Sequence, residues 1–194
     1  MKKLLALFTL AIMILTSTAA FAASKETLEE GADLKAIKRL AIALPMHYKT
    51  VETEPTVEEF TEIIYVGSKS SRCYVIPYSE MATNIKKTSG VDIKTLKTLD
   101  AMKAFQKDVG KFADAYLLVT TANNSSKPQF FFEIYNTDGK LMYVYTVQSG
   151  DYGKNSKDYQ KACEDFFKKL DNAIEKGVKE PDKDKNKLMS MSDQ

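Results

Sequence analysis

The sequence contains few of the residues on which catalytic and metal centres most often depend. Its 194 residues include one histidine, two cysteines and no tryptophan. A metal cluster or a catalytic dyad that uses histidine must therefore rely on His47 alone. No glycine-rich phosphate loop, nucleophile elbow or metal-ligand spacing is found in the sequence either. The sequence predicts no catalytic residue, no metal site and no cofactor.

The sequence also lacks an excess of charge of one sign. Its 28 lysines and arginines are matched by 26 acidic residues, and two of the basic residues, Lys2 and Lys3, precede the first long apolar run. Nucleic-acid binding requires a clustered basic surface that releases counterions from phosphate. Nucleic acid is therefore not expected as a partner.

The first 22 residues have the features of a signal peptide. Lys2 and Lys3 are followed by an apolar run from residue 4 to 15, broken only by Thr9, and Ala20-Phe21-Ala22 fits a signal peptidase site. The run is shorter than the ~20 residues of a membrane span, and no cysteine follows the site to accept a lipid. We expect cleavage after Ala22 and a soluble periplasmic or extracellular protein with no stable membrane anchor; an uncleaved anchor is the alternative.

The composition is typical of one globular domain. The chain is 44% hydrophobic and 28% charged, which argues against disorder over its whole length. Residues 23–35 are polar and contain Gly31, so we expect a flexible lead-in there. Residues 36–178 are predicted to form a single α/β domain, and residues 179–194, rich in Lys, Asp and Glu without periodicity, a disordered charged tail.

Hydrophobic periodicity predicts alternating strands and helices within this domain. Strands are expected at 39–44, 73–76, 115–121, 129–135 and 141–147, and helices at 57–69, 79–87, 100–110 and 155–176. The order is strand, helix, strand, two helices, three strands and a final helix. Alternation in the first half implies parallel pairing, and the Asp138-Gly139 turn signals an antiparallel hairpin. We predict an α/β (α+β) fold with one mixed sheet of about five strands and helices packed on it.

This order and two motifs resemble the small α/β domains of bacterial envelope proteins. The motifs are Arg-Leu-Ala-Ile-Ala-Leu-Pro from Arg39 to Pro45 and Gly-Lys-Phe-Ala-Asp-Ala from Gly110 to Ala115, which leads into the third strand. The group includes the amino-terminal domain of TolB, the curli secretion protein CsgG and the penicillin-binding-protein activator LpoB. The similarity spans roughly residues 36–178. It implies a non-catalytic module that binds other envelope proteins, and it assigns no active-site residue.

The aromatic residues of the hairpin are the most informative candidates for a binding surface. Alternation places Phe131 and Tyr135 on one face of their strand and Phe130 and Phe132 on the other, so both faces carry rings. One face is expected to be core. If the second face is open, its rings form a patch typical of interfaces. The candidate binding residues are Phe131, Tyr135, Tyr143, Tyr145 and His47.

Cys73 and Cys163 are the two thiols of the chain. Cys73 begins a predicted buried strand, and Cys163 lies on the apolar stripe of the final helix. An exported protein meets an oxidising compartment, in which a disulfide between them would be stable. Two separate buried thiols are the equal alternative, because the connectivity cannot be deduced from the sequence.

The sequence predicts a function in binding. The leading hypothesis is an exported, non-catalytic binding or assembly module of the bacterial cell envelope whose partner is another envelope protein. A small-molecule-binding or hydrolytic enzyme that uses His47 and nearby carboxylates is one alternative, because His47 follows the first strand, where sites of α/β sheets often lie. A secreted inhibitor-like or structural protein is the other.

Overall fold

The structure is a computed structural model that describes residues 24–124, 127–148 and 154–177. Its strands and helices follow one another along the chain as β1 (Lys25–Leu28), η2 (Leu34–Ala36), β2 (Arg39–Ile42), α2 (Val57–Gly67), η3 (Ser68–Ser70), β3 (Tyr74–Ile76), α3 (Tyr78–Ser89), η4 (Ile93–Thr95), α4 (Thr98–Asp108), η5 (Val109–Lys111), β4 (Ala115–Asn124), β5 (Lys127–Asn136), β6 (Leu141–Gln148) and α5 (Ser156–Lys176). The predicted signal peptide and the predicted charged tail lie outside the described residues. None of the described helices is long and apolar enough to cross a membrane.

The strands form one mixed sheet in the order β1-β6-β5-β4-β2-β3. Strand β2 pairs in parallel with β3 and β4, whereas the neighbouring pairs β4–β5, β5–β6 and β6–β1 are antiparallel. The predicted α/β class is confirmed, with six strands in place of about five. The additional strand, β1, lies in the segment that was expected to be a flexible lead-in. Its polar sequence gives no strand pattern, and it is held by pairing with β6.

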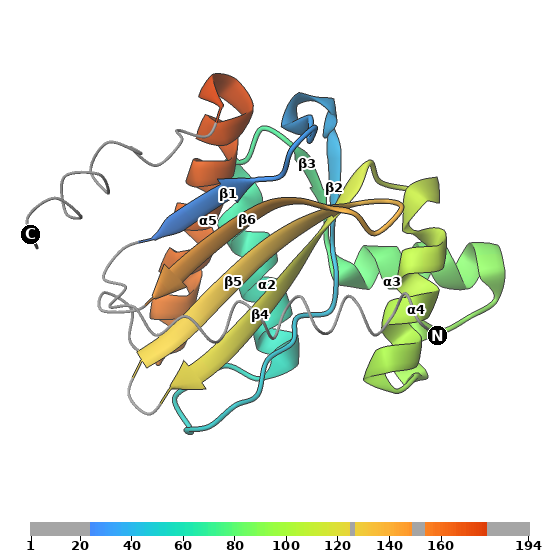
Figure 1. The fold of residues 1–194 in the computed structure, drawn as a ribbon. Coiled ribbons are helices and arrows are strands. Elements are labelled where there is room, and N and C mark those ends of the chain that lie inside the picture. The colour runs from blue at the N-terminus through green and yellow to red at the C-terminus, as the bar shows by residue number, and fades with distance from the viewer. Residues whose placement is uncertain (1–23, 125–126, 149–153, 178–194) are drawn as a thin grey trace, which may run out of the picture.

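Helices α2 and α5 cover one face of the sheet, which we call the inner face (Figure 1). The core on this side is rich in stacked rings; Phe132 of β5 and Phe166 of α5 are parallel, with centroids 4.5 Å apart. Helix α2 begins with a capping box in which Thr56 and Glu59 bond each other's backbone N–H groups. The two helices approach closely at Gly67, where an added Cβ would lie 2.8 Å from the Cβ of Cys163. This face is therefore tightly packed.

Helices α3 and α4 lie on the opposite, outer face, beside β2, β3 and the first part of β4 (Figure 1). Their core contains Met81, Ile85 and Phe105, which pack with Ala41 of β2 and Tyr116 of β4. Figure 1 shows neither of these helices over the far halves of β4, β5 and β6. The outer face is thus covered only in part by the described elements.

Asp114 joins the first residues of β2 and β4. Its carboxylate accepts the backbone N–H groups of Lys38, at 3.0 Å, and Arg39, at 2.8 Å, and pairs with the Arg39 guanidinium at 3.3 Å. Burial alone raises the pKa of this carboxyl group, but the bonds from Arg39 and Lys38 outweigh it and hold the pKa below its usual range. Within the Gly110–Ala115 motif, the aspartate therefore has a structural role.

Candidate functional site

The loop from residue 45 to 56, between β2 and α2, extends the sheet beyond the end of β2. Met46 forms an isolated parallel bridge with Thr120 of β4. Its backbone N–H donates to the Val119 carbonyl at 2.9 Å, and its carbonyl accepts from the N–H of Thr121 at 3.0 Å. Residues after Met46 therefore start from a fixed position beside the second half of β4.

His47 points to the inner face and is only 5% exposed. Its Nε2 lies 2.9 Å from the Pro55 carbonyl, and its Nδ1 lies 2.7 Å from the Thr121 hydroxyl. A carbonyl can only accept, so Nε2 carries a proton and donates it to Pro55. The ring also meets Phe60 and Tyr159 edge to face, at 5.3 and 5.4 Å. Both ring nitrogens of His47 thus serve to hold the loop.

This geometry disfavours the enzyme alternative. A catalytic His47 requires a concave site with a carboxylate or thiol within hydrogen-bond reach. The two polar partners of the ring in the structure are a hydroxyl and a carbonyl. Among the described residues, no group of three or more His, Cys, Asp or Glu is placed to hold a metal ion. His47 is buried against the inner core and is therefore not the exposed binding residue that the sequence predicted.

Glu54 stabilises the same loop and was not identified from the sequence. Its carboxylate is 1% exposed and accepts bonds from the backbone N–H of Thr50, from the Thr50 hydroxyl at 3.0 Å and from the N–H of Val51 at 3.3 Å. The Lys154 ammonium, 3.9 Å away, partly compensates its charge. A buried carboxylate is costly unless it is hydrogen-bonded in this way. Glu54 and His47 together fix the conformation of the loop from within.

The loop presents three large apolar or aromatic side chains to solvent, beside its exposed polar residues Lys49, Thr50, Glu52, Thr53 and Thr56. Tyr48 is 86% exposed, Met46 is 40% exposed and Val51 is 41% exposed. Met46 pairs with Thr120, which lies on the outer face of β4, and exposure alternates through Met46, His47 and Tyr48, as in a segment whose successive side chains face opposite ways. The loop therefore turns Met46 and Tyr48 toward the outer face, opposite to His47.

The outer face of the antiparallel strands continues this surface. The register aligns Phe131 of β5 with Thr120 of β4 and Thr146 of β6, and the neighbouring row contains Leu118 and Val144. Phe131, Val144 and Leu118 are all partly exposed. Neither core cluster has Phe131 or Val144 as a member. We call the surface formed by Met46, Tyr48, Leu118, Phe131 and Val144 the open face.

Glu133 lies within the open face, between Leu118 and Val144 in the same row. Burial raises the pKa of its carboxyl group, and the Tyr135 hydroxyl, which donates to it at 3.1 Å, opposes the shift. The apolar residues of the open face thus surround Glu133, and Thr120 and Thr146 flank Phe131 in the next row.

Three tyrosines predicted as binding residues belong to the core. Tyr143 and Tyr145 pair with Ile134 and Phe132, so they face α5, and both are buried. Tyr135 lies on the outer side but stacks on Tyr116 beneath α4, with ring centroids 5.3 Å apart, and is also buried. Of the predicted hairpin rings, Phe131 is the one that the structure places on the open face. Alternation correctly separates the two faces of β5, but the helix cover decides which rings are exposed.

The two cysteines are free and buried. Burial, together with the charge of Asp171, raises the pKa of the Cys73 thiol to about 11, and this thiol donates to the Ile37 carbonyl at 3.5 Å. Burial likewise raises the pKa of Cys163, which packs against Gly67. The structure thus corresponds to the alternative of two separate thiols, neither of them activated for reaction.

Comparisons with known proteins return structures but no sequence relatives. No family model and no curated protein matches the chain. The LpoB C-terminal domain from Salmonella enterica is similar at a TM-score of 0.41 and 10% identity, over 72% of this chain and 90% of that one. The lipoprotein GNA1162 from Neisseria meningitidis gives 0.42 and 13%, over 71% and 99%. PelC from Paraburkholderia phytofirmans gives 0.42 and 10%, over 77% and 98%. LpoB is thus among the similar structures, whereas the comparison does not show CsgG or TolB.

Proposed function

We propose that the mature chain is an exported, non-catalytic binding module of the bacterial cell envelope, and that it docks a partner protein on the open face. The observation that carries the proposal is the gathering of Met46, Tyr48, Leu118, Phe131 and Val144 on a sheet face that no described helix covers. Exposed apolar surface that is contiguous marks interaction sites more often than scattered apolar residues do.

The rigidity of the loop supports this proposal. An exposed tyrosine on a mobile loop loses conformational freedom when it binds, which reduces affinity. Here the two residues before Tyr48 are fixed, Met46 by its bridge to β4 and His47 by two hydrogen bonds, and Thr50, two residues after it, is bonded to the buried Glu54. Tyrosine and methionine are also enriched in protein interfaces. Buried polar residues are thus used to present an apolar side chain, which suits a surface shaped for binding.

Export supports the envelope as the place of action. The signal-peptide features of residues 1–22 predict a protein that leaves the cytoplasm. A surface that docks protein then meets partners in the envelope or outside the cell. The resemblance of the Arg39–Pro45 and Gly110–Ala115 segments to envelope modules points to the same compartment.

Site-specific photo-crosslinking tests the proposal. A benzophenone amino acid is placed at position 48, at position 131 or, as a matched control, at position 74, since Tyr74 is another exposed tyrosine, 61% exposed on edge strand β3. We expect one and the same partner protein to be crosslinked from positions 48 and 131 and not from 74. Crosslinking from position 74 alone, or from none of the three positions in cells that express the protein at its native level, would contradict docking on the open face.

A further inference from the structure

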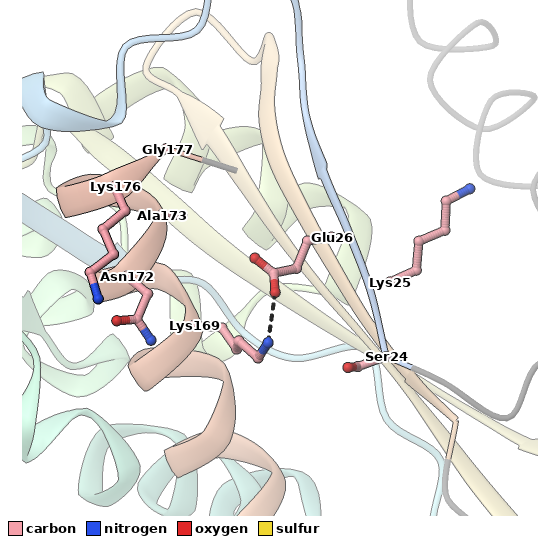
Figure 2. A pocket seen from close by; sticks show the side chains of 8 residues that line it. All are labelled: Ser24, Lys25, Glu26, Lys169, Asn172, Ala173, Lys176 and Gly177. Carbon is pink, nitrogen blue, oxygen red and sulfur yellow. Dashed lines mark ion pairs between the residues drawn. The ribbon is translucent and has the colours of Figure 1, made fainter. Parts of the chain in front are cut away.

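A second surface, separate from the open face, lies at the other edge of the sheet. A groove of about 500 Å³ runs between β1 and the last turns of α5. Ser24 and Glu26 form one wall, and Lys169, Asn172, Ala173 and Lys176 form the other (Figure 2). The groove is therefore bounded by an edge strand on one side and by a helix on the other.

The edge strand has unused backbone groups along this groove. In an antiparallel pair, residues alternate between those bonded to the neighbouring strand and those directed away from it. The N–H of Glu29 donates to the Met142 carbonyl at 2.9 Å. By the alternation, the backbone N–H and C=O groups of Thr27 and Lys25 also point to β6. The N–H and C=O groups of Glu26 and Leu28 consequently point away from β6. No hydrogen bond among the described residues occupies them.

The charge of the groove is mainly positive. The Glu26 carboxylate is neutralised by the Lys169 ammonium, 2.9 Å away, and accepts from the Tyr143 hydroxyl at 3.3 Å. Lys176 adds a positive charge on the helical wall, and Lys25 lies on the opposite side of β1 (Figure 2). The one acidic residue of the groove is thus paired, and the remaining charges favour a ligand with carboxylates.

We propose that this groove binds an extended, acidic peptide segment of another protein, which adds as a seventh strand beside β1. Such a strand lies about 4.8 Å from β1 and bonds to the backbone groups of Glu26 and Leu28. Its carboxylates face Lys176, while Lys169 neutralises Glu26 and so removes the repulsion that this carboxylate would exert. Main-chain bonds provide the affinity, and the positive charge selects the acidic sequence.

One feature favours this edge of the sheet, and another favours this occupant. The other edge strand, β3, is three residues long and is followed by Pro77, so it offers less backbone to a partner strand. The chain's own last residues, 178–194, contain four acidic and four basic residues. They have no net charge to match the groove, whereas an acidic segment of a partner does.

Peptide display provides the test. Random twelve-residue peptides displayed on phage are selected against the mature chain, residues 23–194, and the enriched peptides are synthesised for fluorescence anisotropy. Leu28→Pro removes one of the two outward N–H groups of β1 while leaving the bonds of Lys25 and Thr27 to β6 in place. We expect it to weaken binding at least tenfold. Leu28→Ala keeps the N–H and is expected to weaken binding less than threefold.

A charge reversal gives a second readout that does not depend on the strand edge. Lys176 lies on an exposed turn of α5, so the Lys176→Glu variant is expected to keep the fold. The substitution should weaken binding of the acidic peptides about fivefold at low salt and by less at 0.5 M salt. The proposal is overturned if no peptide is enriched, if enriched peptides bind Leu28→Pro as tightly as the wild type, or if they are not acidic. Enrichment of peptides that crosslink to position 131 instead would assign them to the open face and would also overturn it.

Discussion

The inner and outer faces of the sheet differ in what covers the same kind of side chain. On the inner face, the rings of β5 and β6 lie under α5, and Phe132 stacks on Phe166. On the outer face, Phe131 of the same strand belongs to neither core cluster of the described residues. Strand sequence alone does not distinguish the two positions. The cover of each face determines whether an aromatic side chain contributes to stability or remains available for binding.

Truncation of the inner face should produce the largest loss of stability. Phe166→Ala removes a fully buried ring that contacts Phe132, Phe167 and the hairpin tyrosines, so we expect the free energy of unfolding to fall by about 3–5 kcal/mol. Urea unfolding monitored by circular dichroism measures the change. A loss below about 1 kcal/mol would mean that α5 does not seal this face.

Loss of His47 should have the next largest effect. His47→Ala removes the bonds to Pro55 and Thr121 and leaves both partners unsatisfied, for an expected cost of about 2 kcal/mol. The loop of residues 45–56 should also become sensitive to limited proteolysis. Tyr48→Ala, one residue further along, is the matched control and should leave both stability and proteolysis unchanged. Equal effects of the two substitutions would contradict the opposite orientation of these neighbouring residues.

Substitution of Asp114 tests the contact between its carboxylate and the start of β2, which belongs to neither face of the sheet. Asp114→Asn should reduce the free energy of unfolding at pH 7 by about 1 kcal/mol, since the carboxylate is partly exposed and its charge is screened by solvent. The pKa of Asp114 is lowered in the folded state, so its stabilisation is complete above the unfolded value near 3.8 and is lost as the pH falls through the folded value. The difference between wild type and variant should therefore disappear in acid. A difference that grows below pH 4 would contradict this sign.

The open face should show the smallest effect on stability. Phe131→Ala is expected to change the free energy of unfolding by less than about 1 kcal/mol, because the ring is outside both core clusters. The same substitution should reduce affinity for the crosslinked partner at least tenfold, measured with the purified proteins. A loss of stability close to that of Phe166→Ala would show that Phe131 is a core residue and would remove the distinction between the faces.

The sequence predicted the elements with strong periodicity and the separation of faces within β5. It did not predict β1, because Lys-Glu-Thr-Leu has no strand pattern and its partner β6 is distant in the chain. It also did not predict the burial of His47, whose partner Thr121 is 74 residues away. Tyr143 and Tyr145 could not be distinguished from surface rings before the position of α5 was known.

The pairing of β1 with β6 also bears on how the chain is made. Lys25 lies opposite Thr146, so the sheet cannot be completed until most of the polypeptide has been synthesised, and Phe166 follows later still. Contacts between distant segments form slowly. In the export that we propose for this chain, the delay leaves the first strand without its partner until β6 has been synthesised.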